Sequence, residues 1–295
     1  GNNGSVVLNV GDMENKGIEM ALGWRDKIST VNYRVNATFT RNINTVTRMA
    51  GTNKRSPMGT ISTGNSNDQI TFLCEGMEAG VFMMMPTNGI VNTDQKLAEY
   101  QKLRPDAKMG DLMYVDQNGD GLLNDDDRVN CGSGAPEAEI GLNYGLDWNG
   151  FDFSMNWYAS IGNEIVNGSK VTSYQNGVNK DQVYQWSMYN PYSTIPRIAD
   201  SKHYNTRAYA DIWVEDGSFV RLKNIVLGYS LPKHLVTKWG LGKLRFYVAA
   251  DNLLTFTKYD GYNPEVGNDG LATKGLDMGT YPIAIQMRGG IQLDF

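Results

Sequence analysis

The chain has 295 residues, a formal net charge of −5, 41% hydrophobic residues and 20% charged residues. Its scattered Lys and Arg residues argue against a nucleic-acid-binding protein, and no apolar run approaches the 18 residues of a membrane-spanning helix. Two cysteines without a CxxC pair and two distant histidines argue against zinc and thioredoxin-type sites. A membrane β-barrel stays open, because its strands are half polar.

Apolar and polar residues alternate in seven segments, with the two-residue period of a strand that has one apolar face. The first segment, GIEMALGW, puts Ile18, Met20, Leu22 and Trp24 on one side. The seven predicted strands are 17–24, 31–40, 138–148, 151–161, 219–230, 243–254 and 283–295. We expect the opposite, polar face to carry Asn32, Arg34, Asn36, Gln286, Arg288 and Gln292.

The links between these strands alternate between short and long. The short links are 25–30, 149–150 and 231–242, and the long ones are about 42–137, 162–217 and 255–282. Outer-membrane barrels have this asymmetry, with short periplasmic turns and long extracellular loops. A soluble β-sandwich is the alternative, since its strands alternate too.

Seven strands do not close a membrane barrel, because bacterial single-chain barrels have an even number from eight upward. An open sheet edge in lipid would leave unpaired amides. We therefore expect residues 1–295 to be the C-terminal portion of a larger barrel, with the missing strands N-terminal to them.

An ordered series of motifs supports a family assignment. NKGIEMALGW, GDLMYVDQNGDGLLNDDDR, WVEDGSFVRLKNIVLGYSLP and DNLLTFTKYDGYNPEVG resemble the C-terminal part of SusC/RagA-family TonB-dependent outer-membrane transporters. The resemblance implies an all-β fold, namely about seven C-terminal strands of a 22-stranded antiparallel transmembrane barrel with long extracellular loops. It also implies an N-terminal plug domain, which is absent from this chain.

The same resemblance implies a function and a set of partners. The chain would be the barrel portion of an importer for large nutrients, glycans or oligopeptides, in the outer membrane and in contact with its lipid. It would work with the rest of the transporter, a SusD-like surface lipoprotein and the TonB complex, which acts through the plug. The alternative function is a soluble carbohydrate-binding or adhesin-like β-domain. No set of nucleophile, base and orienting group is visible, so we do not expect an enzyme.

One short motif has the composition of a calcium loop. DQNGDGLLNDDD, at 116–127, has a glycine at the sixth position, where a calcium loop turns sharply. An Asp/Asn/Gly-rich turn held by side-chain bonds to the backbone is the alternative. The candidate calcium ligands are Asp116, Asn118, Asp120, the Leu122 carbonyl and Asp127, with Asn124 at the ninth position.

Two further expectations concern the long links. Cys74 and Cys131 lie in the same predicted outer link, where an oxidising cell surface permits a disulfide between them; free, buried thiols are the alternative. The link 162–217 is rich in aromatic residues, which either bind ligands and partners or pack the link itself. These residues are Tyr174, Tyr184, Trp186, Tyr189, Tyr192, Tyr204, Tyr209 and Trp213.

Overall fold

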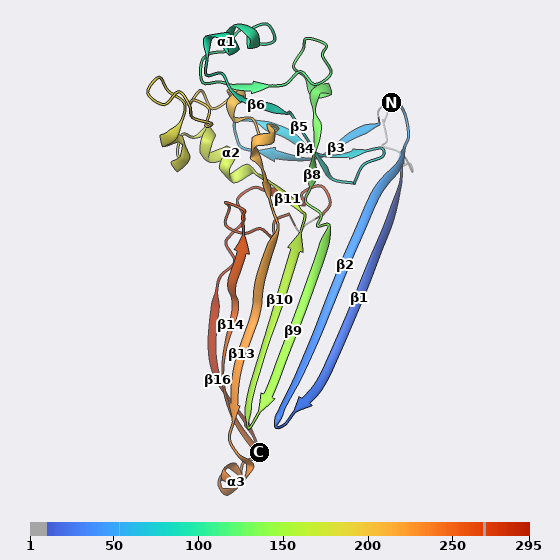
Figure 1. Ribbon diagram of the computed structural model, residues 1–295, viewed down its shortest axis with the longest axis vertical. Coiled ribbons are helices and arrows are strands. Elements are labelled where there is room, and N and C mark those ends of the chain that lie inside the picture. The colour runs from blue at the N-terminus through green and yellow to red at the C-terminus, as the bar shows by residue number, and fades with distance from the viewer. Residues whose placement is uncertain (1–10, 53, 268–269) are drawn as a thin grey trace, which may run out of the picture.

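A computed structural model describes residues 11–52, 54–267 and 270–295. Its main feature is a long sheet of seven strands, each antiparallel to its neighbours, in the order β1-β2-β9-β10-β13-β14-β16 (Figure 1). The seven predicted strands are therefore confirmed, in the predicted order. They are β1 (Gly11–Ile28), β2 (Val31–Met49), β9 (Ala138–Trp148), β10 (Phe151–Ile161), β13 (Phe219–Ser230), β14 (Lys243–Thr257) and β16 (Gln286–Asp294).

The register of this sheet separates apolar from polar residues. Because side chains alternate along each strand, residues that are directly paired across strands share a face. One such row crosses the whole sheet on the apolar face, and its outermost members are well exposed: Trp24 is 62% exposed and Met287 is 75% exposed. The row runs through Trp24, Val35, Tyr144, Met155, Ile225, Ala250 and Met287.

Several strand ends differ from the expected ones. β1 and β2 extend to Gly11 and Met49, because an established antiparallel ladder continues through backbone bonds whatever the side chains are. The last strand starts at Gln286 instead of residue 283. Asn252 has a φ of 53°, and this left-handed residue ends the regular pairing between β14 and β16 at Asp251.

The short and long links lie at opposite ends of the sheet, as their alternation predicts. The short links, including α3 (Lys233–Val236), lie at one end of the sheet, and the three long links gather at the other end (Figure 1). Among the described residues, no helix has the length and apolarity needed to cross a membrane.

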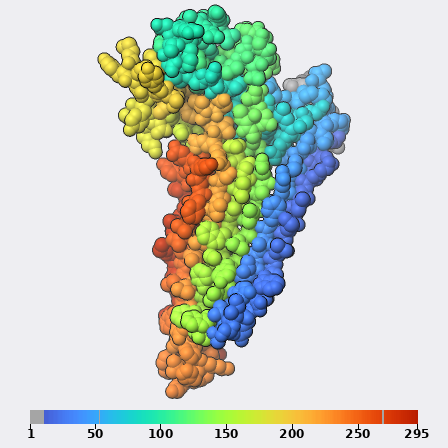
Figure 2. All heavy atoms as spheres, in the orientation of Figure 1, coloured from blue at the N-terminus to red at the C-terminus, as the bar shows by residue number. Residues whose placement is uncertain are grey.

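The three long links fold together into a second body, which we call the cap (residues 50–52, 54–137, 162–218, 258–267 and 270–285; top of Figure 2). A four-stranded sheet has the order β3-β4-β5-β8, a three-stranded sheet has the order β12-β11-β15, and β6 pairs with β7. Two helices, α1 (Asp94–Tyr100) and α2 (Gly168–Gln175), complete it. The cap strands are β3 (Arg55–Ser62), β4 (Asn67–Cys74), β5 (Val81–Met84), β6 (Thr87–Ile90), β7 (Leu112–Tyr114), β8 (Val129–Ser133), β11 (Glu164–Asn167), β12 (Val214–Asp216) and β15 (Leu276–Asp277).

The hydrophobic core lies in the cap and draws on all three links. Its largest cluster joins Phe82 and Met84 of the first link, Trp213 of the second and Leu276 of the third, each at most 2% exposed. Buried charged side chains also connect the first link to the second. The Asp68 carboxylate is 2% exposed and accepts hydrogen bonds from the Arg207 guanidinium and from the backbone N–H of Ala208.

The expected disulfide is wrong, because Cys74 and Cys131 are free. Cys74 ends β4 and Cys131 lies in β8, on opposite sides of β5. Two strand spacings are about 10 Å, whereas a disulfide needs Cα atoms closer than about 7 Å. Burial raises the pKa of both thiols, to about 11 at Cys131, which makes them poor nucleophiles.

Candidate functional site

The polar face of the sheet carries a row of side-chain amides at mid-height. Asn36, Asn143, Asn156 and Asn224 are paired in register on four neighbouring strands, and Asp251 continues the row on β14. We call these five residues the amide row. The Asn156 amide donates to Asn143 Oδ1 at 2.7 Å, and the Asn224 amide donates to Asp251 Oδ1 at 2.6 Å. Asparagine is depleted in strands, so four in one row call for a local explanation.

Ion pairs flank the amide row on β2 to β16. Arg34 Nη1 lies 3.0 Å from Asp147 Oδ2, and Arg245 Nε donates to Asp152 Oδ1 at 2.8 Å. Arg288 is paired with Asp251. These pairs join side chains of different strands along the sheet.

Two glycines let the arginines lie flat on the polar face. A Cβ atom at Gly145 would lie 2.5 Å from Arg34 Nε, and one at Gly228 would lie 2.5 Å from Arg245 Nη2. Both contacts are closer than van der Waals packing allows, so any side chain at these positions would displace the guanidinium. Glycine in a strand interior often marks such a close approach.

The third long link is anchored to the cap end of the polar face. Arg221 is 2% exposed and contacts Glu265 and Asn263, and Lys223 Nζ donates to Glu265 Oε1 at 2.6 Å. In the same link, the Tyr259 hydroxyl donates to Asp277 at 2.5 Å. This link therefore connects the cap to the wall instead of projecting freely.

The candidate calcium loop lies in the cap, and backbone N–H groups occupy its carboxylates. Asp116 accepts from Gly119 at 2.7 Å and from Gly121 at 2.8 Å. Asp127 is fully buried and accepts from Gln117 at 2.8 Å and from Asn124 at 2.9 Å.

The other candidate ligands are also part of this turn network. The Asn118 amide donates to Asp120 Oδ2 at 3.1 Å, and the backbone N–H of Leu122 donates to Asp120 Oδ1 at 2.8 Å. Within the described ranges, no three or more His, Cys, Asp or Glu side chains converge as a metal site. The geometry matches the side-chain-to-backbone turn, and calcium binding stays a prediction.

The aromatic residues of the second long link divide into two groups. Tyr174, Tyr204 and Trp213 are buried in the cap core, and Trp186 and Tyr209 pack against it. The other three are exposed, namely Tyr184 (69%), Tyr189 (97%) and Tyr192 (90%). Composition does not separate the groups, because the division depends on contacts with distant residues of the first link, such as the contact of Tyr204 with Tyr114.

The exposed aromatics form an ordered projection, which we call the tip (residues 183–192; yellow in Figure 2). The backbone N–H of Trp186 donates to Ile195 O at 2.8 Å, and the Asn190 amide donates to Tyr184 O at 2.9 Å. Met188, 84% exposed, lies beside Tyr189. A held turn that presents large apolar side chains is suited to protein contact.

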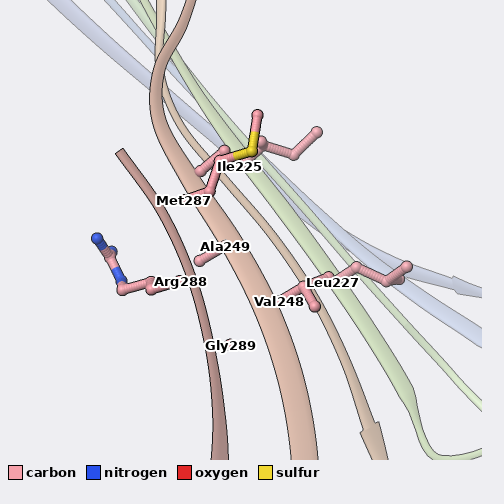
Figure 3. A pocket seen from close by; sticks show the side chains of 8 residues that line it. Ile225, Leu227, Val248, Ala249, Met287, Arg288 and Gly289 are labelled. Carbon is pink, nitrogen blue, oxygen red and sulfur yellow. The ribbon is translucent and has the colours of Figure 1, made fainter. Parts of the chain in front are cut away.

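The apolar face has a hollow of about 450 Å³ where small residues replace large ones. Ala250 and Gly289 line it, together with larger residues of the same face such as Ile225, Leu227 and Met287. Figure 3 shows Arg288 pointing to the other side of the sheet from Met287. Strand alternation thus holds to the edge strand.

The chain is similar to known receptors and transporters over nearly its whole length. No model of a protein family matches it. TonB-dependent receptor P3 of Formosa agariphila is 31% identical over 306 residues, which is 99% of this chain and 30% of that protein. TonB-dependent receptor SusC of Bacteroides thetaiotaomicron is 24% identical over 301 residues, 99% of this chain and 27% of that protein. The chain thus spans about a third or less of these relatives.

Solved structures share the fold. The RagAB peptide transporter superposes with a TM-score of 0.75 at 24% sequence identity, over 97% of this chain and 30% of that chain. The RagAB peptide importer in its "open-open" state gives a TM-score of 0.74 over 97% of this chain and 29% of that one. At this identity the likeness concerns the fold alone, and it identifies the seven-stranded sheet as an open section of a barrel wall.

Proposed function

This chain belongs to the SusC/RagA-type TonB-dependent receptors, and we propose that it is the C-terminal portion of the barrel of an outer-membrane importer for large nutrients. The observation that carries the proposal is the unbroken apolar face, which crosses all seven strands in register. A lipid environment stabilises such a face, whereas water does not. The cargo would be a glycan or an oligopeptide.

The two faces then have separate roles. The apolar face contacts lipid, and the polar face, with the amide row and the paired charges, lines the lumen. All backbone groups in lipid must be paired, so further strands of the transporter would cover the free edges of β1 and β16. The cap would lie outside the cell, above the lumen.

The parts that drive and gate transport would lie in the rest of the protein. We propose an N-terminal plug that fills the lumen and contacts the TonB complex. We also propose that a SusD-like lipoprotein docks on the cap. The tip supports this docking, because it holds Met188, Tyr189 and Tyr192 exposed on an ordered turn.

The alternative, a soluble carbohydrate-binding or adhesin-like domain, fits the apolar face poorly. Side chains such as Leu22, Trp24 and Met287, each more than 60% exposed, would stand in water. Soluble monomers rarely expose a continuous apolar patch of more than a few hundred Å², and this face crosses seven strands.

A fractionation and uptake experiment tests the proposal. The protein that contains this chain, expressed in cells with an outer membrane, should appear in that membrane and need detergent for extraction. Deleting its gene should abolish uptake of at least one oligosaccharide or oligopeptide. Recovery as a monodisperse protein without detergent would overturn the proposal.

A further inference from the structure

The short link between β13 and β14 is larger than a connection between two strands requires. A two-residue turn is enough to join antiparallel neighbours, and residues 29–30 and 149–150 join their strands in that way. Residues 231–242, which we call the knob, instead form α3 and a 3-10 helix (Thr237–Trp239) and project beyond the strand ends (bottom of Figure 1). The added residues therefore need an explanation other than chain reversal.

The knob is an ordered element of the wall. Val236 is buried, at 1% exposure, and the backbone N–H of Leu231 donates to Leu244 O at 2.9 Å. Gly240 ends the helical stretch with a φ of 73°, and the N–H of Leu241 donates to Val236 O at 3.1 Å. These contacts fix the backbone from which the other side chains of the knob reach the surface.

The surface of the knob combines an apolar side with positive charge. Leu235 and Trp239 are 37% and 62% exposed, and their spacing of four residues places them on one side of the helical stretch. Lys233 and Lys238 are exposed as well, and neither forms an ion pair within the described ranges. Residues 217–250 contain no Asp or Glu, so the knob has no acid of its own. Exposed Trp and Leu beside lysines are typical of segments that lie at a membrane surface.

The strands that flank β13 and β14 carry acids near this end, but these acids have other neighbours. On β10, Asp152 forms an ion pair with Arg245. On β16, Asp294 is paired across the strands with Lys243. Both acids belong to the polar face of the wall, so the two lysines of the knob keep their charge for a ligand.

A row of aromatic residues shows where the knob lies relative to the apolar face. Four aromatic side chains on neighbouring strands are paired in register on that face, and two of the pairs are in ring contact: Trp148, Phe151, Tyr229 and Phe246. Membrane barrels carry such girdles where the hydrocarbon meets the headgroups. Leu231 follows Tyr229 by two residues, about 7 Å along the strand. The knob therefore begins at the level of the headgroups.

We propose that the knob binds the anionic headgroups of phospholipids in the periplasmic leaflet. Leu235 and Trp239 insert between the headgroups, and Lys233 and Lys238 face the phosphates. A lysine near an anionic lipid surface strengthens binding about fivefold. An acidic periplasmic protein would also complement the lysines, but the continuity of the knob with the aromatic row and the apolar face favours lipid. The inference rests on the proposed function, which puts the short links at the periplasmic leaflet.

Backbone hydrogen exchange in the complete transporter tests the site. The transporter is placed in nanodiscs of phosphatidylcholine, alone or mixed with phosphatidylglycerol. Amides of the knob should exchange about fivefold more slowly, or slower still, in the mixed nanodiscs. Lys233→Gln combined with Lys238→Gln removes the charge and should abolish this difference. Arg25→Gln combined with Lys27→Gln is the matched control, because these cations lie at the same end of the wall but on its polar face, and it should keep the difference.

A second variant examines the apolar side of the knob. Trp239→Ser should speed exchange of the knob in both kinds of nanodisc, whereas Trp239→Phe should keep most of the protection. Unchanged exchange in Trp239→Ser would show that the indole does not insert, and would overturn the proposed mode of binding.

The outcomes separate lipid from other ligands. Slower exchange in the mixed nanodiscs, lost in the lysine variant and kept in the control, supports the site. Equal exchange of the wild type in the two lipids, or the same slowing in the lysine variant, overturns it. Slowing by soluble glycerol phosphate, or only by a periplasmic extract, also overturns it, because the ligand would then be a free phosphate or a protein. A transporter that does not enter nanodiscs at all would instead refute the proposed function.

Discussion

His203 is a half-buried base whose neutral form the cap requires. Its ring Nδ1 accepts the backbone N–H of Asn205 at 3.2 Å, and Asn205 in turn contacts buried Asp111 and the backbone of Leu112. Burial lowers the pKa of His203 below its ordinary 6.5, although the nearby Asp111 carboxylate opposes the shift. A proton on Nδ1 would remove the acceptor that holds this turn.

We predict that the cap loses stability as the pH falls below 6.5. The unfolded chain binds a proton at His203 near pH 6.5, whereas the folded state resists it until a lower pH. The contribution is therefore fully present above pH 6.5 and is lost through the window below it. Thermal unfolding followed across this range should show the loss in the wild type and a flatter profile in His203→Gln. His234→Gln, in α3 at the far end, is the control; an unchanged profile in His203→Gln would contradict the prediction.

A second prediction concerns Asp127, and it also tests whether the loop 116–127 binds calcium. Its buried carboxylate accepts three backbone N–H groups, from Gln117, Asn118 and Asn124. Asp127→Ala would leave these donors without a partner, at a cost of about 1–3 kcal/mol each when they are not rehydrated. We expect a lower thermal midpoint for the cap with or without calcium. A deficit in Asp127→Ala that appears only when calcium is present would instead identify the loop as an ion site.

At the scale of single elements, β9 offers a direct test of the two faces. Leu142 lies on the apolar face, and Thr38, paired with neighbouring Gly141, lies on the polar face at the same height. Arginine on the lipid side near mid-membrane costs about 2–4 kcal/mol, so Leu142→Arg should lower unfolding stability in detergent or lipid by that amount. Thr38→Arg should change it much less. Equal losses in the two variants would mean that the apolar face does not contact lipid.

The sequence predicts the wall far better than the cap, and the reason is the range of the forces involved. Residues such as Val35, Asn36 and Ala37 alternate because the two faces of each strand meet different surroundings, so the pattern is visible locally. Cap residues such as Phe82 and Trp213 are buried by partners in other links, and no local period marks them. The sequence predicts the amide row only in part, because Asn36 is expected on the polar face whereas the common height of the four asparagines depends on strand register.

For the whole molecule, the positions of the links lead to a prediction about topology. The exposed Leu122 lies in the cap beside Asn124, and the exposed Trp239 lies in the short link at the opposite end of the sheet. In intact cells, an epitope tag after Leu122 should bind antibody, whereas a tag after Trp239 should bind only after the outer membrane is permeabilised. The reverse labelling would invert the orientation and would place the cap in the periplasm.

The position of the hydrophobic core has a consequence for how such a protein is made. Phe82, Trp213 and Leu276 meet in one cluster, yet wall strands separate them along the chain. The three links come together only after β9, β10, β13 and β14 have paired in the sheet. Before that, the apolar residues of the links are exposed and proteases can reach them. We therefore expect a barrel with a misplaced strand to carry an unfinished cap that proteases can degrade.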